Sequence, residues 1–439
     1  MCRDTCSSGM TNRSPKKKQQ QQQYSSSTSS NSTLATSAST ATLDSLDPPP
    51  PPQDDSTAAF YQFDVANLPD TLFHSHVPVE KWLATCTTTN NTSGFPPNSL
   101  NQIHPIEWAV ELERIVGFTL YQFLNVFPFM ILPLLILYFG VATPLARCAV
   151  LLVLAYVAVL SFFTAILEPV FLHKYQQSRF LLAGMKDVHR NQYVYTERNT
   201  TKYLSVKFVW PQSVHRPQLE DTPVLFCIVP HGVVSWGIAA YPLWSKLWND
   251  RICRWAMAPV VLKIPIVRYL ARKVGYIPAK AQPILETLTK RQENVGVVLD
   301  GIAGMFQFHT QQETAFIQQR KGIVKIALRA GVPIVPVYGF GHTSLYTVCV
   351  DPLGVLERVS QKLQVSLTPF TGRWGWILGP PRRVPVTVAL GDPVFCPQIA
   401  DPTQEDIDTY HAELLDKYRV LFETHKTAYG WQHKSLRFV

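Results

Sequence analysis

The stretch VLFCIVPHG, at residues 224–232, decides how this chain is expected to fold. Its first six residues are apolar, and such a run is typical of a strand that is buried on both faces of a sheet. His231 and Gly232 follow where this strand ends. A histidine titrates near neutral pH and can act as a general base, and a glycine lets a ligand or another backbone come close. His231 is therefore a candidate catalytic residue.

Outward from this stretch, short β-rich runs alternate with longer amphipathic ones. The further strand candidates are VGVVL (295–299), VPIVPVYGF (332–340) and VPVTVAL (384–390), and the helical candidates lie near 233–247, 281–291, 321–330 and 403–427. This alternation predicts an α/β fold in which helices cover the faces of a sheet. Polar residues gather where the strands end, which is where open α/β sheets bind their ligands.

Two of these element ends carry further candidate site residues. Asp300 and Gly301 follow the second strand and indicate a tight turn beside a pocket, with an ordinary strand-to-helix turn as the alternative. Arg320, Lys321 and Gly322 stand at the start of a helix. Two cations at a helix N-terminus form a ready anion site, although a solvated basic pair is an equally simple interpretation.

Composition and absent motifs remove several classes of function. The 439 residues carry 40 Lys and Arg against 31 Asp and Glu, and the net charge of +9 forms no long basic runs, which disfavours a nucleic-acid-binding protein. The eight cysteines lie far apart without zinc or disulfide spacing, and no metal site is indicated. The absence of a Gly-x-Ser-x-Gly elbow disfavours a serine hydrolase, and no Gly-x-Gly-x-x-Gly or Walker loop is present either.

Residues 1–60 are expected to form a disordered tail. They combine a lysine run, a glutamine run and the proline run Pro48–Pro52 with few large apolar residues, so they cannot bury enough surface to offset their chain entropy. The tail is either a passive extension or a regulatory segment. Residues 61–114 are interpreted as a pre-membrane segment. Within IHPIEWAVELERIVGF (103–118), apolar residues at helical spacing predict a helix that lies along a membrane interface.

Two uncharged runs follow this segment. No Asp, Glu, Lys, Arg or His occurs from Ile115 to Ala146, or again from Cys148 to Leu167. Because a bilayer core needs about 20 apolar residues per helix, residues 115–168 are predicted to form a two-helix transmembrane hairpin. A hairpin places both of its flanks on one side, and the basic residues that follow it assign that side to the cytosol. The alternative is a buried helical pair inside a soluble domain.

In this order, these pieces resemble the diacylglycerol O-acyltransferase type 2 family, which includes monoacylglycerol acyltransferases and some wax-ester synthases. The resemblance is carried by VPHG (229–232), GYIPAKAQPILETL (275–288), RKGIVKIALRAGVPIVPVYGFG (320–341) and the stretch 391–430. It implies a glycerolipid-acyltransferase-like mixed sheet with flanking helices, in a cytosolic acyltransferase domain over residues 169–439. The expected location is the endoplasmic reticulum membrane, and lipid droplets are a second expected location.

The resemblance also implies a reaction. An acyl group passes from acyl-CoA, which is a cosubstrate rather than a cofactor, to diacylglycerol in the membrane. His231 would take the proton of the acceptor hydroxyl, main-chain N–H groups near Gly232 would stabilise the oxyanion, and Arg320 and Lys321 would hold the phosphates of coenzyme A. Monoacylglycerol and a long-chain alcohol remain open as acceptors, and homo-oligomer formation remains open as well.

Three positions depart from the family pattern. Val229 stands where the family has the first histidine of its block, and Gly304 stands where the family has a glutamate, so that Asp300 is the nearest acid. Broader glycerolipid acyltransferases have an aspartate five residues after the histidine, but here that residue is Trp236. These departures motivate an alternative of a different class, a non-catalytic scaffold on membranes or lipid droplets.

Overall fold

The computed structural model describes the chain in separate stretches. These are 60–64, 86–89, 95–119, 201–211, 222–236, 251–263, 275–306, 311–348, 354–363 and 368–439, with a few single positions between them. The predicted tail lies outside these residues apart from Phe60, and so do most of the predicted hairpin (115–168) and most of the helix expected near 233–247. None of the helices in the described stretches combines the length and the apolar composition that crossing a membrane requires.

A mixed sheet of nine strands organises the described residues, in the order β2-β1-β3-β12-β9-β4-β7-β5-β6. β9, β4, β7, β5 and β6 run parallel, whereas β12 is antiparallel to β9, and β1 is antiparallel to both of its neighbours. The strands are β1 Phe60–Asp64, β2 Thr87–Thr89, β3 Lys207–Pro211, β4 Leu225–Val229, β5 Cys253–Met257, β6 Ile277–Pro278, β7 Asn294–Val298, β9 Ile334–Phe340 and β12 Thr387–Leu390. This confirms the predicted α/β sheet, and β4, β7, β9 and β12 are the four predicted strands.

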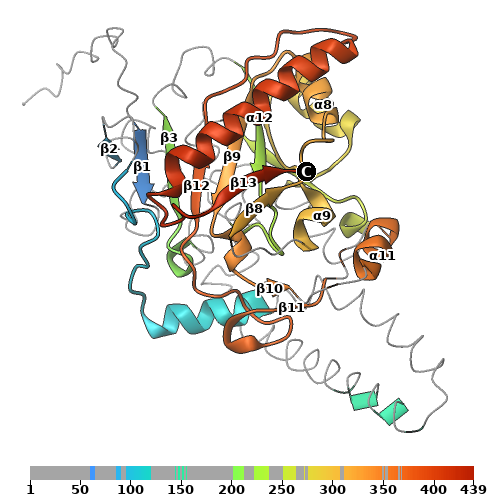
Figure 1. Ribbon diagram of the computed structural model, residues 1–439. Coiled ribbons are helices and arrows are strands. Elements are labelled where there is room, and N and C mark those ends of the chain that lie inside the picture. Colours follow the sequence, from blue (N-terminus) through green and yellow to red (C-terminus); the bar gives the residue numbers. More distant parts are fainter. Residues whose placement is uncertain are drawn as a thin grey trace, which may run out of the picture. The chain divides into compact units, whose positions relative to one another are not determined.

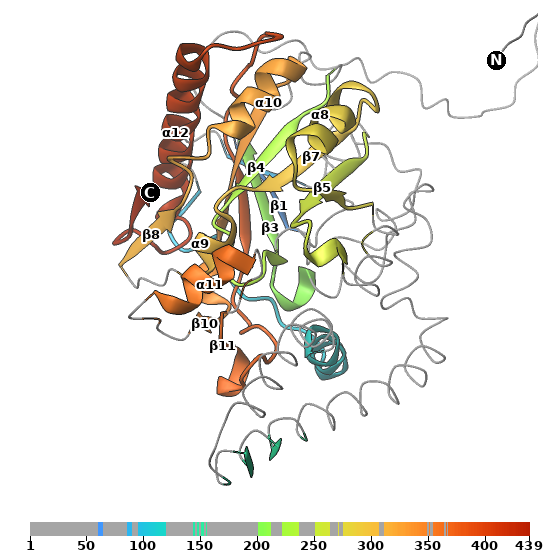
Figure 2. The ribbon, with the colours of Figure 1, turned by 90° about the vertical axis from the view of Figure 1, so that its right-hand side faces the viewer.

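Three helices pack together over one face of this sheet (Figures 1 and 2). α8 (Ala281–Thr289), α10 (Gly322–Ala330) and α12 (Gln404–Lys426) match the helices expected near 281–291, 321–330 and 403–427. Their ends have local causes. Gly331 ends α10 in the left-handed conformation, which costs glycine little, and Thr403 and Asp406 form a reciprocal capping box at the start of α12.

The other described elements are short. They are α9 (Gly301–Phe306), α11 (Val355–Leu363), the pair β8 (Gln312–Ala315) and β13 (Ser435–Phe438), the pair β10 (Thr347–Val348) and β11 (Phe370–Thr371), and the 3-10 turns η5 (Val261–Lys263), η6 (His342–Ser344) and η7 (Arg373–Gly375). Residues 108–119 are also helical, as the pattern over 103–118 predicts.

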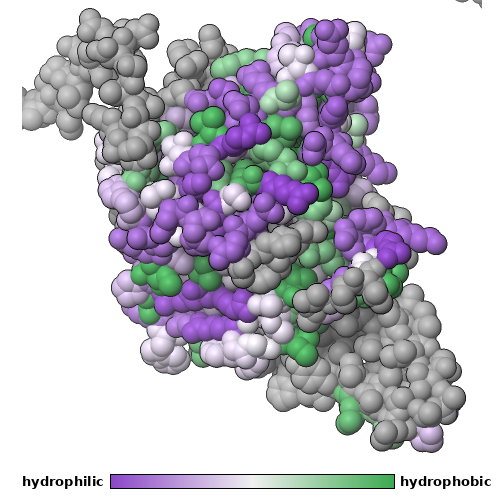
Figure 3. All heavy atoms as spheres, viewed as in Figure 1, coloured by the Kyte–Doolittle hydropathy of each residue, from purple (hydrophilic) through white to green (hydrophobic). Residues whose placement is uncertain are grey.

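The sheet separates two apolar cores because side chains alternate between the faces of a strand. Leu225, Cys227 and Val229 of β4 pack in the core under the helices, whereas Phe226 and Ile228 pack in the core on the opposite face. Burying one such side chain contributes about 1.5–3 kcal/mol, so β4 is anchored from both sides. Beyond the helices, the surface around α12 is mostly hydrophilic, with hydrophobic residues in patches (Figure 3).

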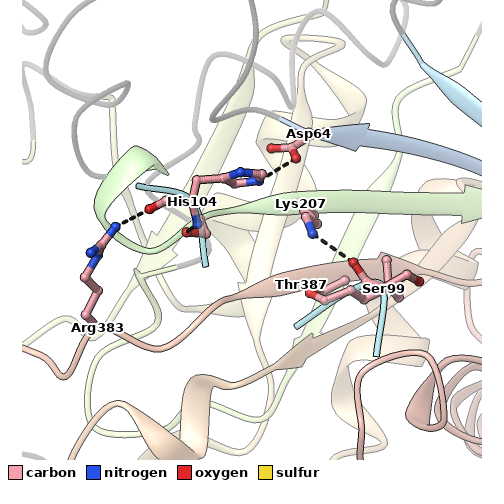
Figure 4. Close-up of polar contacts among 8 residues, drawn as sticks. Asp64, Ser99, His104, Lys207, Arg383 and Thr387 are labelled. Carbon is pink, nitrogen blue, oxygen red and sulfur yellow. Dashed lines mark hydrogen bonds and ion pairs between the residues drawn. The ribbon is translucent and has the colours of Figure 1, made fainter. Parts of the chain in front are cut away.

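The described residues before position 120, which are 60–64, 86–89 and 95–119, belong to the same compact unit as the rest of the domain, Ser56–Val439. β1 pairs with β3, and a set of polar contacts fastens the segment that follows (Figure 4). His104 Nε2 lies 2.6 Å from Asp64 Oδ2, and Lys207 Nζ donates to the Ser99 carbonyl at 2.9 Å. Arg383 donates to the carbonyl of His104. The chain before the predicted hairpin and the chain after it are therefore built into one fold.

Candidate active site

β4 carries the chain to His231, whose imidazole is oriented by its own turn. Nδ1 lies 2.7 Å from the carbonyl oxygen of Gly232. A carbonyl can only accept, so Nδ1 carries the proton and donates it, and Nε2 keeps its lone pair. None of the residues that the structure describes bonds to Nε2. Burial lowers the pKa of His231 below its ordinary value, so the ring is neutral at pH 7 with a basic nitrogen available.

Asp300 holds the backbone of this turn. β7 is a parallel neighbour of β4, so the two strands end at the same edge of the sheet. Oδ2 of Asp300 accepts a hydrogen bond from the backbone N–H of His231 at 2.9 Å. Asp300 is fully buried, and its Oδ1 has no hydrogen-bond partner among the described residues. Burial raises the pKa of Asp300 to about 7, although that hydrogen bond and Arg320 act in the opposite direction. Asp300 thus positions the backbone of His231 rather than its ring.

A second histidine, His342, contacts the same turn and is not among the predicted site residues. Its Nδ1 donates to the carbonyl of Pro230 at 3.2 Å. The carbonyl oxygen of His342 lies 2.8 Å from where a Cβ at position 232 would stand, so a side chain does not fit at that position. The φ of +59° at Gly232 favours glycine as well. Burial lowers the pKa of His342 to about 4, and the nearby His231 adds to this. A sequence signal existed, because Gly341 and His342 directly follow the predicted strand 332–340.

The structure brings most of the predicted site residues together. Gly301, at the start of α9, has a φ of +56°, and the Arg320 guanidinium lies 3.5 Å from where its Cβ would stand. Lys321 is directed away, because its Nζ bonds Oδ1 of Asp408 on α12 at 2.7 Å. Gly322 begins α10 and has open space where a Cβ would lie. In the described part of the chain, no three His, Cys, Asp or Glu side chains are grouped so that they could hold a metal ion.

Comparison with known proteins identifies the family. The family model described as diacylglycerol acyltransferase matches residues 155–438, which include every residue of the site described above. This chain belongs to that family. "Diacylglycerol O-acyltransferase 2-like protein 6" of Homo sapiens is 31% identical over 224 residues, which cover 46% of this chain and 65% of that protein.

Two further relatives in the diacylglycerol acyltransferase family have different names. "Diacylglycerol O-acyltransferase 2" of Mus musculus is 31% identical over 182 residues, which cover 38% of this chain and 46% of the relative. "2-acylglycerol O-acyltransferase 1" of Bos taurus is 31% identical over 224 residues, which cover 47% of this chain and 66% of the relative. The match spans less than two thirds of the length of each of these relatives.

The departures of this chain from the diacylglycerol acyltransferase pattern have a structural context. Val229, in place of the first histidine, is fully buried in the core under the helices. At Gly304, a Cβ would lie 2.5 Å from Oδ2 of Asp300, so the Asp300 carboxylate occupies the space that a side chain at position 304 needs. Trp236 is also buried, and its Nε1 donates to the hydroxyl of Tyr346 at 2.9 Å.

Proposed function

We propose that this protein transfers an acyl group from acyl-CoA to the free hydroxyl of diacylglycerol, forming triacylglycerol, with His231 as the general base. The observation that carries the proposal is the neutral His231 tautomer, which leaves Nε2 without a partner among the described residues. Acyl transfer to an alcohol needs one group that removes the hydroxyl proton, and a neutral imidazole is suited to this at pH 7. Membership of the diacylglycerol acyltransferase family supports an acyl-CoA donor and an acylglycerol acceptor.

In the proposed step, the acceptor hydroxyl gives its proton to Nε2 of His231 while its oxygen attacks the carbonyl carbon of the thioester. The new C–O bond forms, the carbonyl π electrons move onto oxygen, and a tetrahedral oxyanion results. When the carbonyl re-forms, the C–S bond breaks and the leaving thiolate takes the proton from His231, which yields the ester and free coenzyme A. Main-chain N–H groups near Gly232 and Gly301 are the candidate oxyanion donors, and one such donor typically contributes about 3 kcal/mol.

Arg320 and the N-terminus of α10 are the proposed binding site for the phosphates of coenzyme A. α10 begins without a side-chain cap and without an acid in its first turn, so the positive end of its dipole favours an anion. Arg320 is exposed, and the open space at Gly322 gives a phosphate access to the backbone. Lys321 would exchange Asp408 for a phosphate at little cost, because that ion pair is largely exposed.

The proposed location is the endoplasmic reticulum membrane, with the described domain on the cytosolic side and lipid droplets as a second site. The topology of the fold supports a hairpin. β1 and residues 95–114 precede the predicted hairpin, β3 follows it, and all of them belong to one compact unit. Because the chain before residue 120 and the chain after residue 200 meet in this one fold, any membrane crossings between them must be even in number. A two-helix hairpin satisfies this condition.

A microsomal assay tests the proposal. A host that lacks its own triacylglycerol synthesis expresses wild type, His231→Ala or His433→Ala, and the microsomes receive labelled acyl-CoA and diacylglycerol. We expect His231→Ala to lose roughly 100- to 10,000-fold in rate, which is the usual contribution of general base catalysis. His433 is exposed, so His433→Ala should retain the wild-type rate. Full activity of His231→Ala, at equal expression, would refute the assignment of the base.

Monoacylglycerol is a second candidate acceptor, because the bovine "2-acylglycerol O-acyltransferase 1" and the mouse "Diacylglycerol O-acyltransferase 2" are equally identical to this chain. Parallel assays with monoacylglycerol and with a long-chain alcohol identify the acceptor by the lipid that carries the label. If well-expressed wild type forms no labelled product with any of the three acceptors, the enzyme proposal fails. The non-catalytic scaffold is then the better interpretation.

A further inference from the structure

Large apolar side chains are exposed on two segments that lie far apart in the sequence. The helix at 108–119 exposes Trp108 and Leu112, which are one turn apart and so share a face, and the loop after β11 exposes Trp374, Trp376 and Ile377. The exposed fractions are 76% for Trp108, 58% for Trp374, 54% for Trp376 and 72% for Ile377. Scattered exposed apolar residues are ordinary, but a contiguous group of them marks an interaction surface.

The loop that carries Trp374 and Trp376 is a well-defined structure. Its backbone is closed by hydrogen bonds from the N–H of Arg373 to the carbonyl of Pro380 at 2.8 Å and from the N–H of Trp376 to the carbonyl of Arg373 at 3.2 Å. Trp374 and Leu378 have φ values of +56° and +54°, a conformation that costs a bulky L-residue about 1–2 kcal/mol. The fold thus accepts strain in a loop that presents tryptophan to the outside, and such strain is concentrated at functional sites.

The loop and the helix are joined by Arg373. Its guanidinium pairs with Glu111 of the helix, donates to the hydroxyl of Tyr203 at 3.3 Å, and lies 4.5 Å from the centre of the Trp374 ring. In both ribbon views, the helix at 108–119 and the strands β10 and β11 lie at the same end of the domain (Figures 1 and 2). We call Trp108, Leu112, Trp374, Trp376 and Ile377 together the aromatic surface.

We propose that the aromatic surface docks on a lipid bilayer and inserts into its headgroup region, beside the point where the chain enters the membrane. The main argument is continuity. The helix at 108–119 leads directly into the uncharged run that extends to Ala146. If that run enters the bilayer, then Trp108, Leu112 and the loop joined to them lie next to the membrane. Tryptophan is the side chain that prefers this interface, because its ring is apolar and its N–H is polar.

The charges around the loop fit an anionic headgroup layer. Between Glu357 and Asp392 the sequence has no acidic residue and five basic ones; Arg373 is paired with Glu111, and the other four are Arg358, Lys362, Arg382 and Arg383. On the helix, the acids Glu111 and Glu113 are each paired with an arginine. A basic segment near a bilayer is attracted to anionic lipids by about 1 kcal/mol for each Lys or Arg.

The aromatic surface is also connected to the His231 turn. The ring of Phe118, in the same helix, lies 4.5 Å from the ring of Trp236, which follows His231 by five residues. Docking would thus fix the orientation of the turn relative to the bilayer in which the acceptor lipid is dissolved. This inference rests on the proposed function for the membrane location of the chain and of its acceptor.

Site-specific photo-crosslinking tests the proposal in the full chain. p-Benzoylphenylalanine replaces Trp376, Trp108 or Val420 in separate preparations, each reconstituted in vesicles of phosphatidylcholine and phosphatidylserine. Val420 is the matched control, because it is an apolar residue of α12 that is 51% exposed and lies on the mostly hydrophilic surface. After irradiation, mass spectrometry identifies what each position has captured. We expect lipid adducts at positions 376 and 108 and only background at position 420.

A fourth preparation with the crosslinker at Leu135, in the predicted hairpin, separates this inference from the proposed location. Lipid adducts at position 135 together with background at 376 and 108 would overturn the docking surface and leave the membrane location standing. Background at all four positions would overturn both. A crosslinked dimer at position 376 would assign the aromatic surface to a second copy of the chain, which would also overturn the proposal. Adducts at 376 that equal those at 420 would show random capture and refute it.

Discussion

The carboxylate of Asp300 and any side chain at position 304 compete for one buried space, which makes the two positions a direct test of the site. A Cβ on Gly304 would stand 2.5 Å from Oδ2 of Asp300, far inside van der Waals contact. Gly304→Ala should therefore destabilise the fold by about 1–3 kcal/mol through overpacking. This is opposite in sign to the gain of about 1 kcal/mol that alanine ordinarily brings over glycine in a helix.

Gly304→Glu adds a second buried carboxylate to the same space. Burial already raises the pKa of Asp300 to about 7, so two carboxyls in this space cannot both ionise, and the glutamate side chain lacks room beside Asp300; this variant should lose both stability and acyltransferase activity. The double variant Asp300→Gly with Gly304→Glu leaves one acid in that space and removes the clash. We expect it to recover activity and to show a coupling free energy of about 3 kcal/mol in a double-mutant cycle.

Thermal unfolding of the detergent-solubilised protein measures these effects, at roughly 2–4 °C in Tm for each kcal/mol, and the labelled acyl-CoA assay measures activity in parallel. Gly322→Ala is the matched control for stability. It also exchanges glycine for alanine in a helix, but its Cβ would enter open space, so Tm should hold or rise. If Gly304→Glu keeps the wild-type Tm and activity, or if the two substitutions are additive, Asp300 does not occupy that space and the reasoning is refuted.

Three further predictions follow from buried and open groups elsewhere in the domain. Burial lowers the pKa values of His342 and His425 to about 4, so the folded protein keeps both rings neutral. The stability that this contributes is fully present above pH 6.5 and is lost as the pH falls toward 4, by up to about 3 kcal/mol for each histidine. Thermal unfolding from pH 7 to pH 5 should show this fall, and a flat profile would contradict it. Lys434→Met leaves the Glu313 carboxylate buried without its cation, which should lower the free energy of unfolding by about 3–5 kcal/mol. Adding Glu313→Gln should restore most of that stability. An unchanged Tm in Lys434→Met would argue against the buried ion pair. Gly322→Ala should raise the KM for acyl-CoA roughly tenfold without loss of stability, because the added methyl group blocks one hydrogen bond from the backbone to a phosphate, worth about 1.5 kcal/mol. An unchanged KM would show that Gly322 is not part of the phosphate site.

The four strands at the centre of the sheet were predictable, and the strands that flank them were not. β4, β7, β9 and β12 lie within apolar runs that are recognisable from their own residues. β1 (FYQFD) and β3 (KFVWP) mix polar and apolar residues, and they pair although the whole predicted hairpin lies between them in the sequence. A short mixed strand is stabilised by its neighbours in the sheet, so its own composition does not reveal it.

The sequence by itself determined the local properties of this protein. Apolar periodicity determined the α/β class, charge-free runs determined where a membrane segment is to be sought, and His231 was recognisable because it follows a buried strand. Only the tertiary structure decided which side chains meet. Asp300 bonds His231 across 69 positions and His342 bonds Pro230 across 112, because β7 and β9 flank β4 in parallel and end at the same edge. Lys321, predicted to face the same site, bonds Asp408 instead. Local preferences depend on residues a few positions away, whereas these contacts depend on strand order and register, which no local pattern encodes.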